Sequence, residues 1–216
     1  MTEPSYLTDT RHGYNAIATG YAERFEGVHE IPLVRAMLGA FAELTRDNGP
    51  VLDVGSGPGW VTWYLDSLGV KVSGVDLSTS MLQLARETYP GLRFEEGSMT
   101  ALDQPDHSLA GLVAWYSIIH IGAEDLPAVF AEFRRVLMPG GHLALAFQVG
   151  DDTVHHSEGF GHQISLDFRR LRPERIATQL EEAGFAVEAQ LVRAPNAQEK
   201  VPQAYLLAST SQAADA

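Results

Sequence analysis

Alternating glycine residues follow a short apolar segment of the chain. The stretch VLDVGSGPGW places Gly55, Gly57 and Gly59 directly after four residues typical of a buried strand. Glycine permits a positive φ angle and lets the backbone come close to a ligand. The next apolar segment, VKVSGVD, ends in Asp76, and an acid at that place can accept hydrogen bonds from both hydroxyls of a ribose. The two features together predict a nucleoside site beyond the carboxyl ends of two strands.

The spacing of the glycines argues against a dinucleotide. The G-x-G-x-x-G fingerprint fails from Gly55, because its last position is Trp60, and it fails from Gly57, because its last position is Thr62. No G-K-[ST] follows, which excludes a Walker loop. Trp60 at the expected helix start also hinders a pyrophosphate, which must lie against free backbone amides. The sequence favours a nucleoside ligand without a phosphate.

Several aromatic and histidine side chains are candidates for contact with a second substrate. His120, in YSIIHI, is a candidate general base because histidine titrates near neutral pH; a buried, hydrogen-bonded histidine is the alternative. Trp60 and Tyr116 are candidates for an aromatic wall. Tyr14 and Tyr21 are seven residues apart and so share one face of a helix. For all four aromatic residues, ordinary core packing is the alternative.

The neighbouring His155 and His156, with His162 close by, raise the question of a metal site. Adjacent residues of a strand point to opposite faces, and no third ligand stands at a convincing spacing. We therefore expect no metal, and we assign His156 to contact with the substrate. The chain has no cysteine, which excludes disulfides, thiolate catalysis and zinc–thiolate sites.

The elements that must position these residues alternate between strand and helix, which predicts an α/β fold with a mostly parallel, doubly wound sheet. A short connection between the last two strands predicts an antiparallel hairpin at the edge. Residues 151–172 are expected to be irregular. Helices are expected at 10–25, 31–45, 58–69, 78–91, 124–141 and 173–185, and strands at 51–54, 70–76, 92–97, 109–117, 142–150, 186–194 and 203–209.

Composition narrows the class of protein. The 216 residues, 45% of them hydrophobic, are enough for one substantial core. A net charge of −13 disfavours nucleic acid and anionic membrane surfaces as partners. The N-terminus lacks the pattern of a signal peptide, and no apolar run is long enough to span a bilayer. We expect a cytoplasmic protein, either monomer or homodimer.

Four segments in this order resemble the class I, seven-stranded, S-adenosyl-methionine-dependent methyltransferases, over about residues 10–210. VLDVGSGPG resembles their glycine-rich first motif, and GVDLSTSML resembles their ribose-binding second strand. FEEGSMTALDQPDHSLAGLVAWYSIIHI resembles the stretch that holds adenine and leads into the fourth strand. FRRVLMPGGHLALAF resembles the helix, turn and fifth strand that follow. The resemblance implies a Rossmann-like sheet and S-adenosyl-methionine as the cofactor.

The resemblance also implies roles for single residues. The backbone of Gly55, Ser56 and Gly57 is expected beside the methionyl part of the cofactor, as is Trp115. Asp53 is expected to fix this turn and the amino group. The remaining cofactor contacts implied are Asp76 to the ribose, Leu77, Met81, Ser98 and Met99 to the adenine, and Tyr21 to the carboxylate.

The N-terminal helix is expected to fold over the site as a lid, with Tyr14 covering it. The resemblance places His120 on the acceptor side of the site, and we take His120 and Tyr14 as the catalytic candidates. Trp60, Tyr116 and His156 are the candidates for substrate contact. Two positions depart from the family pattern, because Ser98 and Ala110 stand where many members have aspartate.

These observations predict transfer of a methyl group from S-adenosyl-methionine to an oxygen or nitrogen atom of a small-molecule or short-peptide acceptor. The alternatives are a cofactor-binding protein without transferase activity, cyclase-like or regulatory, and an NAD-dependent oxidoreductase. One domain is expected. Its parts are a helical lid (1–48), a cofactor-binding half (49–150), a substrate-side insertion (151–172) and a C-terminal helix with strands (173–210).

Overall fold

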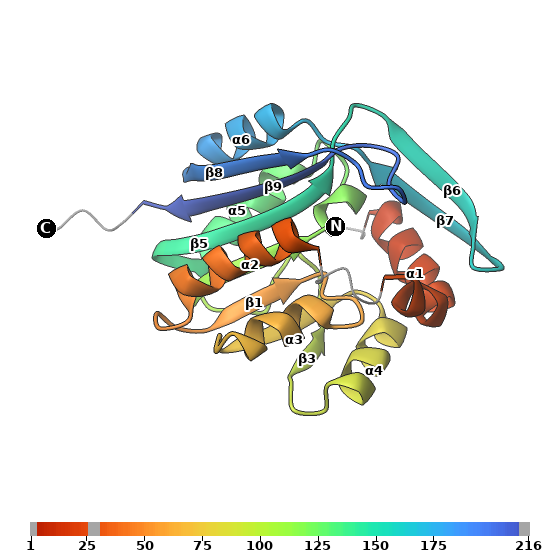
Figure 1. Ribbon diagram of the computed structural model, residues 1–216, viewed down its shortest axis with the longest axis horizontal. Helices are drawn as coiled ribbons and strands as arrows, with labels where there is room; N and C mark the ends of the chain where they lie inside the picture. Colours follow the sequence, from red (N-terminus) through yellow and green to blue (C-terminus); the bar gives the residue numbers. More distant parts are fainter. Residues whose placement is uncertain (1–3, 26–30, 212–216) are drawn as a thin grey trace, which may run out of the picture.

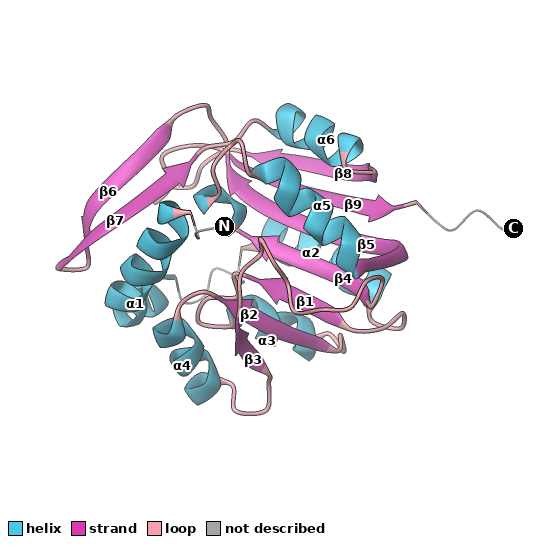
Figure 2. Cartoon of the chain, turned by 180° about the vertical axis from the view of Figure 1, so that it is seen from behind, coloured by secondary structure: helices cyan, strands magenta, loops and turns pink. Residues whose placement is uncertain are grey.

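The computed structural model describes residues 4–25 and 31–211. Its centre is a seven-stranded sheet of order β3-β2-β1-β4-β5-β9-β8, in which β1 to β5 run parallel (Figures 1 and 2). β9 is antiparallel to both of its neighbours, which confirms the expected hairpin at the edge. The strands are β1 (Val51–Val54), β2 (Val72–Asp76), β3 (Phe94–Glu96), β4 (Leu109–Trp115), β5 (Leu137–Gln148), β8 (Phe185–Arg193) and β9 (Gln203–Thr210).

Helices cover both faces of this sheet, which explains why the central strands are apolar throughout. Every residue of β1 and β4 is buried, as a strand with helices on both sides requires. On one face lie α2 (Pro32–Thr45) and α3 (Trp60–Ser67); on the other lie α5 (Leu126–Val136) and α6 (Pro173–Glu182). α4 (Thr79–Thr88) packs against β2 and β3. The expected doubly wound architecture is confirmed.

Local signals in the sequence account for several helix boundaries. The Ser78 hydroxyl accepts a hydrogen bond from the Met81 amide at 3.1 Å and so caps α4. Pro127 lies in the first turn of α5, where its missing amide costs nothing. That helix ends at Val136 rather than near residue 141, and β5 already begins at Leu137. Pro139 cannot continue a helix, and the chain pairs with β4 instead.

Residues 151–172 form a β-hairpin, so the expectation of an irregular segment is wrong. β6 (Thr153–Gly159) and β7 (His162–Arg169) pair antiparallel as a separate two-stranded sheet. Phe160 and Gly161 connect them with φ angles of 50° and 79°, which match a tight hairpin turn with positive φ at both central residues. Most of β6 is exposed, so its residues are polar and do not show the apolar pattern that indicates a strand.

The hairpin lies against α1 (Ser5–Phe25), and both lie at the end of the sheet toward which β1 points (Figure 1). α1 begins five residues before the expected Thr10. A Cβ atom on Gly13 would come within 2.7 Å of Leu166, and one on Gly20 within 2.7 Å of Phe160. The two glycines therefore allow the helix to approach the hairpin closely.

Candidate active site

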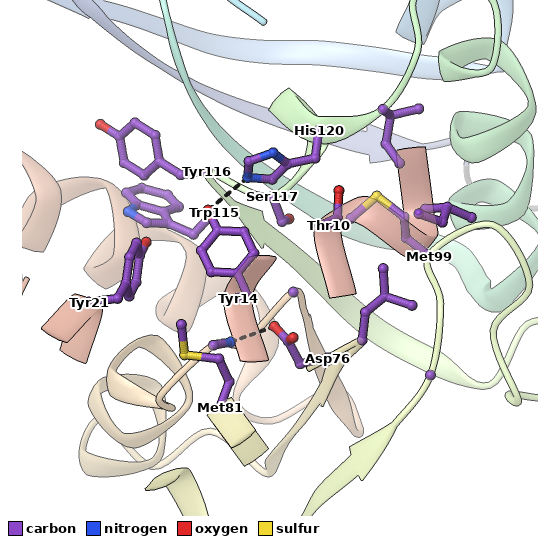
Figure 3. A pocket seen from close by; sticks show the side chains of 16 residues that line it. Thr10, Tyr14, Tyr21, Asp76, Met81, Met99, Trp115, Tyr116, Ser117 and His120 are labelled. Carbon is purple, nitrogen blue, oxygen red and sulfur yellow. Dashed lines mark hydrogen bonds between the residues drawn. The ribbon is translucent and has the colours of Figure 1, made fainter. Parts of the chain in front are cut away.

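A cavity opens where the carboxyl ends of β1, β2 and β4 meet the inner face of α1. It holds about 650 Å³ of empty space, including its open mouth. Its wall combines the glycine turn after β1, the end of β2, the segment after β4 and one face of α1 (Figure 3). The lining residues are Leu7, Thr10, Tyr14, Tyr21, Gly55, Gly57, Asp76, Leu77, Met81, Gly97, Met99, Trp115, Tyr116, Ser117, His120 and Ile121.

The turn between β1 and α3 requires glycine at each of its three glycine positions, since φ is 76° at Gly55, 53° at Gly57 and 89° at Gly59. A Cβ atom on Gly55 would lie 2.3 Å from the Cβ atom of Ser117, so this glycine permits close approach of two backbones. A Cβ atom on Gly57 would meet nothing within 4 Å. Gly57 therefore faces the open cavity.

Asp76 joins the ends of β1 and β2 at the cavity floor. Its Oδ2 accepts a hydrogen bond from the Gly57 amide at 2.8 Å, and its Oδ1 accepts one from the Ser78 amide at 2.8 Å. Burial raises the pKa of this carboxyl, and the hydrogen bonds from the backbone amides oppose that effect. An ionised carboxylate has about four lone-pair sites, so both oxygens keep acceptor capacity for a ligand.

The side chains of Asp53 and Ser56 lie behind the glycine turn, while the contact expected of Ser56 is through its backbone. The carboxylate of Asp53 is buried and accepts a hydrogen bond from the Thr62 hydroxyl at 2.7 Å, which ties β1 to α3. Burial raises the pKa of Asp53 to about 7. Ser56 is also buried, and its side chain points toward Gly74. Neither side chain lines the cavity.

The side of the cavity near β2 and β3 is apolar. Leu77, Met81 and Met99 line it, and the backbone at Gly97 completes it. Ser98 does not line it, because its hydroxyl shares a hydrogen bond of 2.8 Å with the Thr100 hydroxyl.

α1 forms the roof of the cavity and is fastened to α4. The Asn15 side-chain oxygen accepts hydrogen bonds from the Ser78 hydroxyl at 2.8 Å and from the Ser80 amide at 3.1 Å. Tyr14 and Tyr21 both reach the cavity, with ring centroids 5.4 Å apart in an edge-to-face arrangement. Burial raises the pKa of both phenols, that of Tyr21 to about 12, so both are neutral.

His120 lies at the boundary between roof and wall. Its Nδ1 is 2.9 Å from the backbone carbonyl oxygen of Asp167, and its Nε2 is 2.8 Å from the Tyr14 hydroxyl (Figure 3). Only 6% of the residue is exposed. Burial, with the Arg169 guanidinium close by, lowers the pKa of His120 to about 4, so the imidazole is neutral at pH 7.

An aromatic group forms the wall opposite β2. Trp115 stacks on the buried Tyr205 with centroids 5.2 Å apart, and the Tyr116 hydroxyl lies 3.2 Å from that of Tyr205. The guanidinium of Arg193 donates to the Tyr205 oxygen at 2.9 Å and pairs with Glu199. Glu199 therefore lies behind this wall and does not line the cavity.

Two substrate candidates from the sequence lie elsewhere. Trp60 packs with the core between α2, α3 and the sheet, and His156 is exposed on β6 with its ring against Phe168. Sequence reasoning missed several lining residues, of which Leu7 and Thr10 carried a signal, since they precede Tyr14 at helical spacing. The other missed lining residues are Gly97, Ser117 and Ile121.

A smaller polar cavity of about 290 Å³ adjoins the first, and Thr10 and His120 line both. Its wall includes Asp167 and Arg169 of β7 and His155 of β6, whose Nδ1 lies 2.8 Å from Asp167 Oδ1. No group of three or more histidine, aspartate or glutamate side chains suited to a metal occurs among residues 4–25 and 31–211. In the same part of the chain, no helix has the length and apolar character needed to cross a membrane.

Comparisons with known proteins agree with this geometry. The family described as "Methyltransferase domain" matches residues 51–141. A demethylmenaquinone methyltransferase of Chlorobaculum parvum is 30% identical over 155 residues, which are 71% of this chain and 60% of that protein. The chain thus spans about 60% of the length of the first curated relatives.

Solved structures share the fold. A 1,6-didemethyltoxoflavin-N1-methyltransferase of Burkholderia thailandensis, solved with 1,6-didemethyltoxoflavin and S-adenosylhomocysteine, has a TM-score of 0.76 at 19% identity, covering 98% of this chain and 92% of that one. The 4+2 cyclase SpnF has a TM-score of 0.64 at 17% identity, covering 83% and 82%. Residues 51–141 thus match a methyltransferase domain, and the sheet has the topology of the class I S-adenosyl-methionine-dependent methyltransferases.

Proposed function

We propose that the protein transfers a methyl group from S-adenosyl-methionine to an oxygen or nitrogen atom of a small-molecule or short-peptide acceptor. The observation that carries the proposal is the cavity in which a positive-φ glycine turn meets Asp76 beneath α1. Ligands of open α/β sheets bind beyond the carboxyl ends of the strands, which is where this cavity lies.

The residues of the cavity fit this cofactor. The space beside Gly57 is open, and the Asp76 oxygens retain lone pairs for the hydroxyls of a ribose. Leu77, Met81 and Met99 offer the apolar surface that an adenine ring requires. The methionyl part is assigned to the region of Gly55, Trp115 and Tyr21. Asp53 and Ser56 are assigned to support of the turn rather than to contact.

The chain's own residues have to align the acceptor and exclude water. Bound S-adenosyl-methionine supplies a methyl group that its positive sulfur has already activated. Holding the acceptor in line can supply several kcal/mol of the rate acceleration. α1 covers the cavity from above, and the hairpin of β6 and β7 supports α1 from behind. We therefore assign α1 and residues 151–172 to the acceptor side of a single methyltransferase domain. α2, which the sequence grouped with the lid, covers a face of the sheet instead.

A small acceptor is favoured over a macromolecule. The cavity is roofed by a helix whose Asn15 is bonded to α4, which leaves a confined space for the acceptor. Two of the proteins compared above are methyltransferases named for demethylmenaquinone and for 1,6-didemethyltoxoflavin. Both names support an acceptor of that size and leave its identity open.

Binding of the cofactor without methyl transfer is the second candidate, because the cyclase SpnF shares the fold. The deciding experiment incubates the protein with S-adenosyl-methionine and a fractionated metabolite extract, and follows metabolites by mass spectrometry. A transferase produces a metabolite heavier by one methylene group, and deuterium on the donor methyl group appears in that product. An Asp76→Ala variant serves as the control. Binding of S-adenosylhomocysteine with no labelled product in any fraction would favour the second candidate.

A further inference from the structure

The directions of the hydrogen bonds around His120 follow from its partners. The backbone carbonyl of Asp167 can only accept, so the hydrogen of the neutral ring is on Nδ1, 2.9 Å from that oxygen. Nε2 then carries a lone pair and accepts the hydroxyl proton of Tyr14, 2.8 Å away. A lowered pKa, about 4, keeps the ring neutral and so preserves this arrangement.

The Tyr14 hydroxyl therefore donates its hydrogen to His120. Its lone pairs have no protein partner among the described residues, and Tyr14 lies in the wall of the main cavity. Figure 3 shows the Tyr14 hydroxyl directed toward His120, with Trp115 and Tyr21 nearby. A ligand in the cavity therefore finds at this oxygen a hydrogen-bond acceptor and no donor.

We propose that the Tyr14 oxygen contacts the methyl acceptor, and that the acceptor atom binds with its proton attached, as N–H or O–H. The inference rests on the proposed methyl transfer, and it adds which residue the acceptor meets and what kind of atom is methylated. Tyr14 is then the catalytic contact, and His120 is a positioning residue that acts through it.

The proton follows the existing hydrogen bonds. The acceptor atom forms a bond to the methyl carbon while the carbon–sulfur bond breaks, and that electron pair stays on sulfur as a neutral thioether. The proton of the acceptor atom passes to the Tyr14 oxygen, and the original Tyr14 proton passes to His120 Nε2. Because the pKa of His120 is about 4, the imidazolium returns the Nε2 proton through the Tyr14 oxygen to water once the product has left the main cavity.

The weak basicity of His120 narrows the acceptor class further. A ring with a pKa of about 4 does not deprotonate an aliphatic ammonium group, whose pKa is near 10. The arrangement suits an atom that is nucleophilic before it loses its proton, such as a weakly basic amine or a ring N–H, or an acidic hydroxyl. It does not suit a tertiary amine or a thioether, because neither has a proton to give to Tyr14.

The first test is spectroscopic and requires no acceptor. Two-bond hydrogen–nitrogen correlation spectra of the histidine rings, recorded with saturating S-adenosylhomocysteine at neutral pH, distinguish the two tautomers. We expect His120 as the Nδ1–H tautomer, with an Nε2 signal that shifts in Tyr14→Phe and stays in place in Tyr89→Phe, which lies outside the cavity against Trp63. An Nε2–H tautomer in the complex overturns the inference.

The second test uses whichever acceptor the labelled-methyl screen yields. His120→Gln keeps an oxygen that can accept the Tyr14 hydrogen bond and removes the site that can take a proton. We expect Tyr14→Phe and His120→Gln each to lower kcat by about tenfold or more, with little change in the Kd of S-adenosylhomocysteine. Wild-type kcat in His120→Gln, or an acceptor methylated on a tertiary amine or thioether, overturns the inference. Absence of S-adenosylhomocysteine binding instead contradicts the proposed function.

Discussion

At the scale of single residues, Asp76 connects ligand binding with the shape of the glycine turn. Its carboxylate holds the backbone amides of Gly57 and Ser78 at 2.8 Å each, so the turn after β1 and the start of α4 share one anchor. A ribose that binds the same carboxylate would meet a preformed acceptor. Preorganisation of this kind lowers the entropic cost of binding.

We predict that Asp76→Asn weakens binding of S-adenosylhomocysteine by about 1.5 to 3 kcal/mol, which is about a ten- to hundredfold rise in Kd. The amide offers one acceptor oxygen in place of two and removes the charge. Titration calorimetry measures the change, and circular dichroism checks that the variant is folded. Asp47→Asn is the matched control, because the Asp47 side chain is 89% exposed at the end of α2. Equal affinity in the Asp76 variant and the control would disprove the ribose assignment.

We predict that the contribution of Asp53 to the free energy of unfolding depends on pH. Its folded-state pKa, about 7, is above the ordinary value of 3.8, so the folded protein binds this proton more tightly than the unfolded chain does. The contribution of Asp53 to stability is present at low pH and is lost as pH rises from about 4 to about 7. Asp53→Asn keeps an acceptor for Thr62 and does not titrate. Relative to wild type, it should gain about 2 kcal/mol between pH 5 and pH 8.

Urea unfolding of the cofactor-free protein at both pH values provides the measurement for Asp53. The difference between variant and wild type is the informative quantity, because titrating groups that do not interact with Asp53 contribute equally to both proteins. A constant difference across this range would show that Asp53 titrates normally in the folded state.

At the scale of elements, α1 is held between the cavity and the hairpin of β6 and β7. Tyr14 and Tyr21 face the cavity, while Gly13 and Gly20 lie against Leu166 and the turn of the hairpin. The position of the roof therefore depends on glycines that touch no ligand. Substitution of one of them should change binding without altering a single side chain of the cavity.

We predict that Gly13→Ala destabilises the protein and weakens binding of S-adenosylhomocysteine several-fold. The new Cβ would lie 2.7 Å from Leu166, so helix and hairpin must separate. Gly39→Ala is the matched control, because a Cβ there in α2 meets nothing within 4 Å, and it should stabilise the protein by about 0.5 to 1 kcal/mol. Thermal unfolding and calorimetry report the two effects. Unchanged affinity in Gly13→Ala would show that binding of S-adenosylhomocysteine does not depend on the position of α1.

The sequence correctly predicted the elements whose patterns are local. The strands of the main sheet, the glycine turn and Asp76 all carry a signal within a few residues, and the structure has them close to the expected places, except that β5 begins at Leu137 rather than at residue 142. The hairpin of β6 and β7 was missed, because β6 lies mostly exposed and lacks an apolar alternation. The signal that was available is the alternation of Ile164, Leu166 and Phe168 after the turn at Gly161.

The direction in which a side chain points is a second feature that the sequence could not predict. Asp53, Ser56 and Trp60 are close in sequence to residues that line the cavity, but their side chains point away from it. The direction of each side chain depends on the path of the turn. The hydrogen bond from Tyr14 to His120 joins residues 106 positions apart, and no local sequence pattern predicts a contact over that distance. The sequence could identify both residues as candidates, but only the fold brings them into contact.

At the scale of the whole molecule, the sheet order brings separate parts of the chain to one edge. β1 lies between β2 and β4, so the turn after β1, Asp76 at the end of β2 and the segment after β4 meet there. α1 arrives from the N-terminus, and the hairpin is inserted between β5 and α6. The central claim, that this edge binds S-adenosyl-methionine, therefore depends on the topology as a whole.

The most direct test of that claim is titration calorimetry of the wild-type protein with S-adenosylhomocysteine and, separately, with NAD. Our account predicts saturable binding of S-adenosylhomocysteine at one site per chain and no heat of binding with NAD, because the turn lacks the spacing for a dinucleotide. Binding of NAD in place of S-adenosylhomocysteine, or binding of neither, would contradict it.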